Sequence, residues 1–456
     1  MSVNTPSAPT ADTGKTASGQ RKAVASSVIG TVLEWYDFYI YGTAATLVLG
    51  KLFFPDLSPL AGMLAAFATY GIGFFFKPVG GIILSRFGDT FGRKRVMILS
   101  LVAMGLATGA IGLLPTYEAI GVAAPVLLVL LRLIQSIGAG AEYGGAITLV
   151  SEYSTDKRRG LMASLPAMGV SLGILMGTGM FALLSLMPDD KFESWGWRIP
   201  FLIGFSLVVV GLYIRTQVDE TPEFEKLKEE NRIVKAPLRW LWSEQRRNLL
   251  IAAGARSADA VGGQLFNVFA IAYTTSHLDL PKHVGLTGVM AANLVGLAVI
   301  PFTGSIADKY GRRPVYLGGL AFLALFTFPF FWMVNTESYL LVVVALVLAY
   351  GFGVKVILSV SGAYLAELFD TRVRSSAVTT ARTASDPIAG LTPLIATSLL
   401  AAAGSYWAVA LFFLCFVLLA FYCVFIGPET QRLGVNNTED TPAPLQEDLV
   451  SKGETR

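Results

Sequence analysis

The sequence predicts an all-α membrane protein of twelve transmembrane helices arranged as two six-helix halves. Of the 456 residues, 54% are hydrophobic and only 15% are charged, against roughly 25% charged in an ordinary soluble protein. The mean hydropathy is +0.59. So few charges cannot cover the surface of a soluble protein of this size, so the chain is expected to lie in a lipid bilayer.

Composition also excludes several other classes of protein. The 35 lysines and arginines nearly balance the 32 aspartates and glutamates, which argues against a nucleic-acid partner. The two cysteines, Cys415 and Cys423, lie in one apolar stretch, where they can neither staple a fold nor build a metal site. The two histidines, His277 and His283, share one short loop. We therefore expect no metal, no cofactor and no enzymatic activity.

Apolar stretches long enough to cross about 30 Å of hydrocarbon follow one another from residue 24 onward. Residues 1–23 contain no such stretch and no signal-peptide pattern, and are predicted to be a solvated tail. Gly404 and Ser405 divide the last uncharged run into two helices. The predicted spans are 25–48, 60–84, 96–114, 121–150, 161–187, 198–215, 248–275, 284–306, 314–334, 338–362, 376–402 and 405–426.

Basic residues gather in the loops that follow the second, fourth, eighth and tenth spans. Those loops hold twelve lysines and arginines, whereas the other side holds four: Lys51, Lys191, Arg198 and Lys282. Because basic loops stay in the cytoplasm, both termini are predicted to be cytoplasmic. The predicted parts are a cytoplasmic tail (1–23), a first bundle (24–215), a charged central cytoplasmic loop (216–247), a second bundle (248–427) and a second tail (428–456).

The two halves carry the same loop motifs. Residues 88–94 (Gly-Asp-Thr-Phe-Gly-Arg-Lys) match residues 307–313 (Ala-Asp-Lys-Tyr-Gly-Arg-Arg) at an offset of 219. Residues 152–159 match residues 367–374 at an offset of 215. Two independent pairs at nearly one offset indicate a duplicated six-helix unit. Such repeats are typical of transporters whose site lies near the bilayer midplane, between the halves.

Ionisable residues inside the spans are the candidates for a transport site. A charge at a helix centre costs roughly 2.5–3.5 kcal/mol, so it is expected to face a wet cavity or a partner. The nine that we single out are Glu34, Asp37, Arg132, Glu142, Arg256, Asp259, Lys355, Arg382 and Asp386. Five acids and four bases around one cavity suit a charged solute better than a neutral sugar.

Most of these residues also have a structural interpretation. Arg256 and Asp259, three residues apart, could form a pair within one helix. The same holds for Arg382 and Asp386, which are four residues apart. Glu34 could pair with a basic residue in a loop. The long side chains of Lys355 and Arg132 could reach an interface if their helices are shifted by a turn.

A second set of candidates lies in the loops on the basic side. An acid and a base one helical turn apart at a helix end can latch one conformation and release in another. The alternative is that these basic loops only fix the topology. The predicted latch residues are Asp89, Arg93, Asp308, Arg312, Glu152, Arg159, Glu367 and Arg374.

These motifs resemble those of the major facilitator superfamily. Residues 85–95 and 304–313 resemble its repeated loop signature, and residues 132–135 (Arg-Leu-Ile-Gln) resemble its fourth-helix signature, with departures at Ser85, Thr90 and Ser136. Further segments are similar to one branch, the metabolite:proton symporters. These are residues 34–39 (Glu-Trp-Tyr-Asp-Phe-Tyr), 141–146 (Ala-Glu-Tyr-Gly-Gly-Ala), 195–201 (Trp-Gly-Trp-Arg-Ile-Pro-Phe), 220–225 (Glu-Thr-Pro-Glu-Phe-Glu) and 366–369 (Ala-Glu-Leu-Phe).

The resemblance implies the major facilitator fold and proton-coupled uptake of a small organic anion by alternating access. Shikimate, 2-oxoglutarate and other mono- or dicarboxylates are the implied substrates. Asp37, Glu34 and Glu142 are the expected proton-coupling residues, because protonation removes a charge that would be stranded in a dry site. The bases expected to hold carboxylate are Arg132, Arg256, Lys355 and Arg382.

Two alternatives stay open: an importer of a zwitterionic osmolyte such as proline or betaine, and a proton-linked exporter. The tail 429–456 has no heptad pattern, unlike the coiled-coil tails of osmosensing members, which favours the anion. The expected partners are the anion, protons and membrane lipids, with no nucleic acid. The chain is expected to be a monomer in the inner (plasma) membrane.

Overall fold

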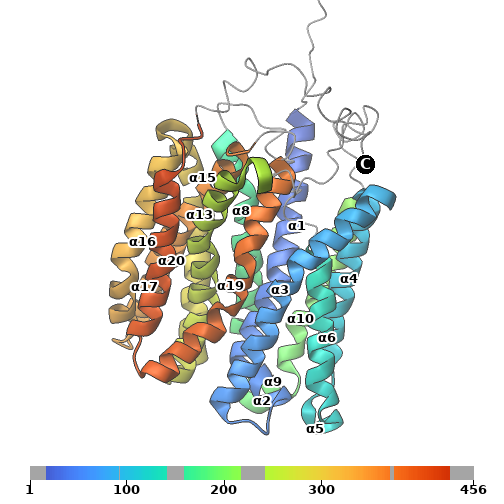
Figure 1. Ribbon diagram of the computed structural model, residues 1–456. Helices are drawn as coiled ribbons and strands as arrows, with labels where there is room; N and C mark the ends of the chain where they lie inside the picture. The colour runs from blue at the N-terminus through green and yellow to red at the C-terminus, as the bar shows by residue number, and fades with distance from the viewer. Residues whose placement is uncertain (1–16, 92, 141–158, 217–241, 370–373, 432–456) are drawn as a thin grey trace, which may run out of the picture.

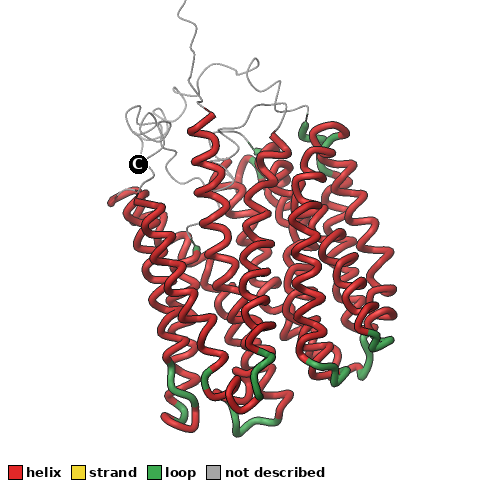
Figure 2. Tube along the Cα trace, turned by 180° about the vertical axis from the view of Figure 1, so that it is seen from behind, coloured by secondary structure: helices red, strands yellow, loops and turns green. Residues whose placement is uncertain are grey.

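The computed structural model describes residues 17–91, 93–140, 159–216, 242–369 and 374–431. Throughout these ranges the regular elements are helices, and no strand occurs among them (Figure 2). The helices run roughly side by side, and the described connections between them are short (Figure 1). The predicted all-α fold is therefore confirmed.

The first six membrane-crossing segments lie within the first half of the chain. They are α1 (Ala17–Ala44) continued by η1 (Ala45–Leu49), α3 (Pro59–Phe91), α4 (Arg93–Leu113), α6 (Ala123–Ala139), α8 (Arg159–Leu184) and α10 (Ile199–Thr216). Four short helices lie in the connections: α2 (Gly50–Phe53), α5 (Tyr117–Ile120), α9 (Asp189–Ser194) and η3 (Gly196–Arg198). Residues 17–23, expected as tail, form the first turns of α1, where Ala, Gln, Arg and Lys are good helix formers.

The second six segments follow the same plan, with π-helical stretches in two of them. The first of these segments is α13 (Arg246–Gln264), η4 (Leu265–Phe269), α14 (Ala270–Ala272) and η5 (Tyr273–His277) in succession. Then come α15 (Lys282–Tyr310), α16 (Arg312–Val334), α17 (Tyr339–Leu346) with η6 (Val347–Val354) and α18 (Lys355–Glu367), α19 (Arg374–Ala403) and α20 (Trp407–Ile426). Such π-helical stretches often mark functional sites.

Length and composition support membrane crossing for most of these segments. Among the described residues, seven helices are long and apolar enough to cross a membrane, and three shorter apolar helices add to them. The α1 and α13 segments are the two that fall outside both sets, and both carry buried charged residues. The chain is a multi-pass membrane protein of twelve crossing segments, and buried charged residues also lie on α3, α6, α18 and α19.

The two ends of the bundle are distinct. Helix α1 begins and α20 ends at the same end of the bundle, which we call the termini side (Figure 1). The short helices α2, α5 and α9 lie at the other end, the opposite side (Figure 1). This arrangement agrees with an even number of crossings.

Helix α8 packs against α1 of its own half and against α15 of the other half. A row of glycines lets the backbones of α8 and α1 approach closely. A Cβ atom added at Gly169 would lie 2.6 Å from the carbonyl oxygen of Val28, and one added at Gly173 would lie 2.6 Å from that of Val32. Small residues at such a seam allow the close helix packing that membrane bundles use.

Replacing the central glycine of this seam tests the packing. We expect Gly173→Ala to lower the midpoint of thermal unfolding in detergent, because the new methyl group would press on the Val32 carbonyl. Overpacking costs about 1–3 kcal/mol, more than the roughly 1 kcal/mol that alanine gains over glycine in a helix. The control is Gly318→Ala on α16, where an added Cβ meets no atom within 4 Å. A midpoint for Gly173→Ala equal to that of the control would contradict the seam.

Candidate functional site

Asp37 on α1 is linked to α4 and α6 by a chain of hydrogen bonds. One carboxylate oxygen, Oδ1, contacts the Thr108 hydroxyl, which also accepts a hydrogen bond from Gln135 Nε2 at 2.9 Å. Gln135 Oε1 in turn accepts one from Arg132 Nη1 at 2.5 Å. The other oxygen, Asp37 Oδ2, is buried and has no hydrogen-bond partner among the described residues. The side chain is thus held on one oxygen only.

The Thr108 hydroxyl has one hydrogen and two acceptors within reach. It can donate to Asp37 Oδ1 or to the carbonyl oxygen of Met104 at 2.8 Å. If the hydroxyl donates to Met104, the hydrogen between Thr108 and Asp37 has to come from a protonated Asp37. The contact therefore suits both the carboxylate and the carboxylic acid, with the direction of the hydrogen bond reversed.

Arg132 is fully buried behind aromatic rings. Its guanidinium carbon lies 4.4 Å from the ring centre of Tyr41, 4.7 Å from that of Phe38 and 5.3 Å from that of Tyr70. Contacts of this kind stabilise a desolvated guanidinium. Arg132 reaches Asp37 through Gln135 and Thr108, and it does not line the cavity described below. The sequence predicted that Arg132 contacts the substrate, whereas in the structure its side chain does not line the cavity.

Glu34 forms a buried ion pair that the sequence analysis missed. Lys77 Nζ on α3 lies 2.5 Å from Glu34 Oε1, and both side chains are buried. The ammonium also lies 4.9 Å from the ring centre of Phe38 and 5.8 Å from that of Trp35. Glu34 therefore pairs with an intramembrane lysine and not with a loop base. A single lysine inside the apolar stretch 60–84 was the available signal.

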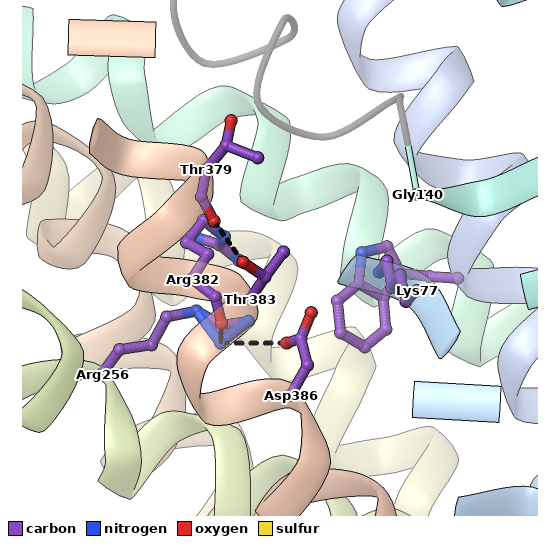
Figure 3. Close-up of a pocket in the computed structure, with 8 residues that line it drawn as sticks. Lys77, Gly140, Arg256, Thr379, Arg382, Thr383 and Asp386 are labelled. Carbon is purple, nitrogen blue, oxygen red and sulfur yellow. Dashed lines mark hydrogen bonds and ion pairs between the residues drawn. The ribbon is translucent and has the colours of Figure 1, made fainter. Parts of the chain in front are cut away.

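A cavity separates these helices from α13 and α19 of the second half (Figure 3). Its first part is lined by Trp35, Lys77, Gly140, Arg256, Thr379, Arg382, Thr383 and Asp386. Arg256 Nη1 donates a hydrogen bond to Ser385 Oγ at 2.9 Å and lies 3.5 Å from Asp386 Oδ1. Both halves thus contribute charged side chains to one space, and the cations outnumber the acid.

The cavity continues past Trp35 towards the middle of the bundle. Its second part is lined by Trp35, Tyr39, Phe74, Val170, Arg256, Asp259, Ala260, Gly263, Gln264, Tyr350, Val354, Leu358, Arg382, Asp386 and Ala389. Hydrogen bonds between the halves run here: the Tyr39 hydroxyl donates to the Gly263 carbonyl at 3.2 Å, and the Tyr70 hydroxyl to Gln264 Oε1 at 2.7 Å. The arrangement brings Arg256, Asp259, Arg382 and Asp386 together on the second-half side of the cavity.

An exposed ion pair joins the halves on the opposite side. Lys282 Nζ at the start of α15 lies 2.6 Å from Asp189 Oδ1 on α9. The lysine beside it lowers the pKa of the Asp189 carboxyl below its ordinary value. Together with the Tyr39 and Tyr70 bonds, this pair holds the two halves in contact on that side.

Lys355 is fully buried and lies behind the cavity wall. Its Nζ donates a hydrogen bond to the Tyr350 hydroxyl at 3.0 Å and lies 4.3 Å from the centre of that ring. Tyr350 lines the cavity, whereas Lys355 does not. The side chain does not reach an interface, so the snorkelling interpretation is excluded for this conformation.

On the termini side, three of the predicted latch residues meet. Arg312 Nη1 lies 2.8 Å from Asp308 Oδ1, and Arg312 Nη2 lies 3.3 Å from Glu367 Oε1. Asp308 also accepts hydrogen bonds from the backbone N–H groups of Gly160 at 2.8 Å and Leu161 at 2.9 Å, at the start of α8. An acid of the second half therefore caps a helix of the first half, a favourable position for a negative charge.

The remaining predicted residues lie outside the part of the chain whose side chains the structure describes. Glu142 and Glu152 fall in the segment 141–158, which is not described. The side chains of Asp89, Arg93, Arg159 and Arg374 are likewise not described. The first-half latch and Glu142 therefore stay predictions.

Comparison with known proteins gives consistent matches. The family model of the Major Facilitator Superfamily matches residues 27–385 and 258–453. The shikimate transporter of Escherichia coli (strain K12) is 35% identical over 417 residues, which cover 90% of this chain and 95% of the relative. The proline/betaine transporter of Salmonella typhimurium (strain LT2) is 35% identical over 391 residues, covering 82% of this chain and 77% of the relative.

Solved structures share the fold at much lower identity. The crystal structure of the D-xylose–proton symporter superposes with a TM-score of 0.70 at 16% identity, covering 91% of this chain and 99% of that chain. A partially occluded inward open structure of the xylose transporter XylE from E. coli gives the same TM-score and coverage. These structural matches show the arrangement of helices, and the 35% identical relatives show the family.

Breaking the Glu34–Lys77 pair tests its energetic role. We expect Lys77→Met and Glu34→Gln each to lower the unfolding midpoint in detergent, because either change leaves an unpaired buried group, at a cost of about 3–5 kcal/mol. The double variant should be less destabilised than the sum of the two. The control is the exposed Lys51–Glu193 pair, with an N–O contact of 2.6 Å, for which Lys51→Met should cost at most about 1 kcal/mol. Additive effects at positions 34 and 77 would disprove the coupling.

Proposed function

We propose that this chain, which belongs to the major facilitator superfamily, takes up a small organic anion together with protons by alternating access. The observation that carries the proposal is the lining of the cavity between the halves. Arg256 and Arg382 face it against one acid in its first part, Asp386, and Lys77, which already pairs with Glu34, faces it from the first half. Basic groups of this kind bind carboxylate oxygens through charge-assisted hydrogen bonds. The shikimate transporter, which is 35% identical over 90% of this chain, supports a small carboxylate as the substrate.

Arg256 and Arg382 are the proposed carboxylate-binding residues, with Lys77 as a third cation from the other half. Arg256 already holds Asp386 at 3.5 Å in this state, so an incoming carboxylate would compete with Asp386 for the guanidinium. That competition offers a way for the anion to rearrange α13 and α19. Arg132 and Lys355 lie behind the lining and would act on the site indirectly.

Asp37 is the proposed proton carrier. It is buried, one of its oxygens has no partner among the described residues, and its Thr108 contact suits both protonation states. Glu34 is neutralised by Lys77 and would contribute to coupling through that pair. Glu142 stays a third candidate. Because the membrane potential supplies roughly 2.3 kcal/mol per net charge per 100 mV, protons carried in excess of the anion's charge would drive accumulation.

The two contact regions between the halves would serve as the alternating gates. We propose that the termini side faces the cytoplasm and that the chain acts as a monomer surrounded by lipid in the inner membrane. The Lys282–Asp189 pair and the bonds of Tyr39 and Tyr70 would then close the outer side. The Asp308 contacts to the start of α8 would be part of the inner gate.

One observation favours a second candidate, a zwitterionic osmolyte. Trp35 and Tyr39 line the cavity near Asp259 and Asp386. Aromatic faces beside carboxylates can bind a quaternary ammonium group, while an arginine binds the carboxylate at the other end of the same solute. The proline/betaine transporter is 35% identical over 82% of this chain.

Proton-coupled transport can be tested with purified protein in liposomes that contain a pH dye. Shikimate, 2-oxoglutarate, citrate, benzoate and proline betaine would be added in turn. We expect a carboxylate to acidify the lumen, and Asp37→Asn to abolish that acidification and uphill uptake while counterflow exchange of the same solute persists. Exchange persists because a permanently neutral residue 37 still allows the loaded carrier to change conformation.

Three results would change this assignment. Acidification by proline betaine alone would show that the substrate is a zwitterionic osmolyte and not an organic anion. No acidification by any of the five solutes, with folded protein, would refute the proposed function for this class of substrate. Uphill uptake by Asp37→Asn at the wild-type level would remove Asp37 from the coupling mechanism.

The carboxylate-binding role can be tested at the two arginines. Arg256→Gln and Arg382→Gln are each expected to raise the KM for the transported carboxylate about 10- to 100-fold, because a charged hydrogen bond contributes about 1.5–3 kcal/mol. Arg246→Gln is the matched control, since Arg246 lies on the same helix as Arg256 but is exposed. An unchanged KM for both site variants would contradict the assignment.

A further inference from the structure

Lys355 occupies an unusual position for a lysine. It is 0% exposed and lies at the start of α18, where the π-helical stretch η6 returns to α-helix. The aliphatic part of the side chain fills the space left by Gly296 on α15, where an added Cβ would lie 2.9 Å from Lys355 Cγ. The absence of a side chain at Gly296 makes room for the lysine side chain, and a larger residue at position 296 would collide with it. The position is therefore shaped to hold this side chain in the interior.

The lysine has no counter-ion among the described residues. Its one hydrogen-bond partner there is the Tyr350 hydroxyl, and no described carboxylate pairs with it. Burying an isolated ammonium in such surroundings costs a large free energy of desolvation, so the group loses its proton and becomes a neutral amine. Tyrosine hydroxyl and ring contacts offset only part of that cost. The amine is expected to be neutral while the cavity is empty.

The charged groups on the helices around Lys355 either lie several turns away from it along their helix or line the cavity on the other side of Tyr350. On α15, Asp308 follows Gly296 by twelve residues, about 18 Å along the helix. Glu367 follows Lys355 by the same interval on α18. After Arg159 at its start, α8 contains no charged residue, and Arg312 and Arg313 of α16 lie at its termini-side start. Four charged residues face the cavity from α13 and α19: Arg256, Asp259, Arg382 and Asp386.

Tyr350 connects the buried amine to this cavity. Its side chain lines the cavity, and its hydroxyl contacts Lys355 Nζ at 3.0 Å. A hydroxyl can pass its own hydrogen to the amine and regain one from a hydronium ion that enters the cavity, so that one proton moves from hydronium to Nζ, a water molecule is left and the hydroxyl is restored. An anion bound in the cavity would lower the cost of an ammonium behind Tyr350, because opposite charges attract strongly where the dielectric is low.

We propose that Lys355 is a second proton-binding group of the transporter, which takes up a proton through Tyr350 when a carboxylate occupies the cavity and releases it when the carboxylate leaves. This inference rests on the proposed function, since it requires an anion in the cavity. It assigns to the second half a proton site separate from Asp37 on α1. Anion and proton then bind cooperatively, and each transported anion carries one proton at this site.

The protonation state of Lys355 can be read directly by NMR. Full-length protein in detergent, labelled with ¹⁵N at lysine Nζ, is expected to show one neutral-amine resonance at pH 7 that is absent from Lys355→Met. Lys191→Met, at an exposed lysine on α9, is the control and should leave that resonance in place. Adding shikimate or 2-oxoglutarate should convert the resonance to that of an ammonium. An ammonium resonance for Lys355 before any anion is added would overturn the inference.

Coupling stoichiometry gives the second measurement. In liposomes, the number of protons per carboxylate, obtained from the reversal potential, should be lower by one in Lys355→Met than in the wild type or Lys191→Met. Lys355→Arg, which cannot release its proton, should lose net uptake. Unchanged stoichiometry in Lys355→Met refutes the Lys355 site and leaves the proposed function intact.

The remaining outcomes separate the two proposals. A wild-type protein that transports none of the five test solutes refutes the proposed function. The Lys355 inference then fails as well if its resonance does not respond to shikimate or 2-oxoglutarate. A response of the resonance without transport would retain the anion-linked proton site while rejecting symport.

Discussion

The cost of burying charge in a membrane protein governs this structure. A charged side chain at the centre of a membrane helix is tolerated only where a partner, a polar network or water compensates for lost hydration. The chain meets this requirement in different ways. Glu34 and Lys77 neutralise each other directly, Asp37 and Arg132 are joined through neutral groups, and the arginines of α13 and α19 face a cavity. Lys355 has no described counter-ion, and its one described hydrogen-bond partner is the Tyr350 hydroxyl, so its burial calls for a functional explanation.

Much of the fold could be predicted from the sequence because bilayer crossing imposes a length and a composition. Most predicted spans coincide with observed helices, and the differences fall at helix ends. Helix α3, for instance, runs to Phe91 although the apolar stretch ends near residue 84. Helices continue beyond the hydrocarbon because backbone hydrogen bonds are retained in the headgroup region. Local composition predicts where a helix crosses the membrane and is less informative about where it ends.

The candidate site was less predictable, because facing directions depend on how helices pack against each other. Sequence spacing put Arg256 near Asp259 and Arg382 near Asp386, whereas the closest described ion pair among them joins Arg256 to Asp386 on another helix. Arg132 was expected to meet substrate, yet Phe38, Tyr41 and Tyr70 enclose it, and these aromatic residues come from two other helices. Pairing across helices of this kind, including Glu34 with Lys77, has no local sequence signature.

Helix α1 connects the proposed proton site to the cavity. Trp35 and Tyr39, four residues apart, share the helix face that lines the cavity, while Asp37 lies between them on the face towards α4 and α6. A change of protonation at Asp37 would alter its bond to Thr108, and therefore the position of α1 relative to α4. Because α8 packs on α1 through a glycine seam and on α15 across the halves, a shift of α1 would reach the interface between the halves. Proton binding and the cavity would then be coupled mechanically through one helix, without direct contact between the proton and the substrate.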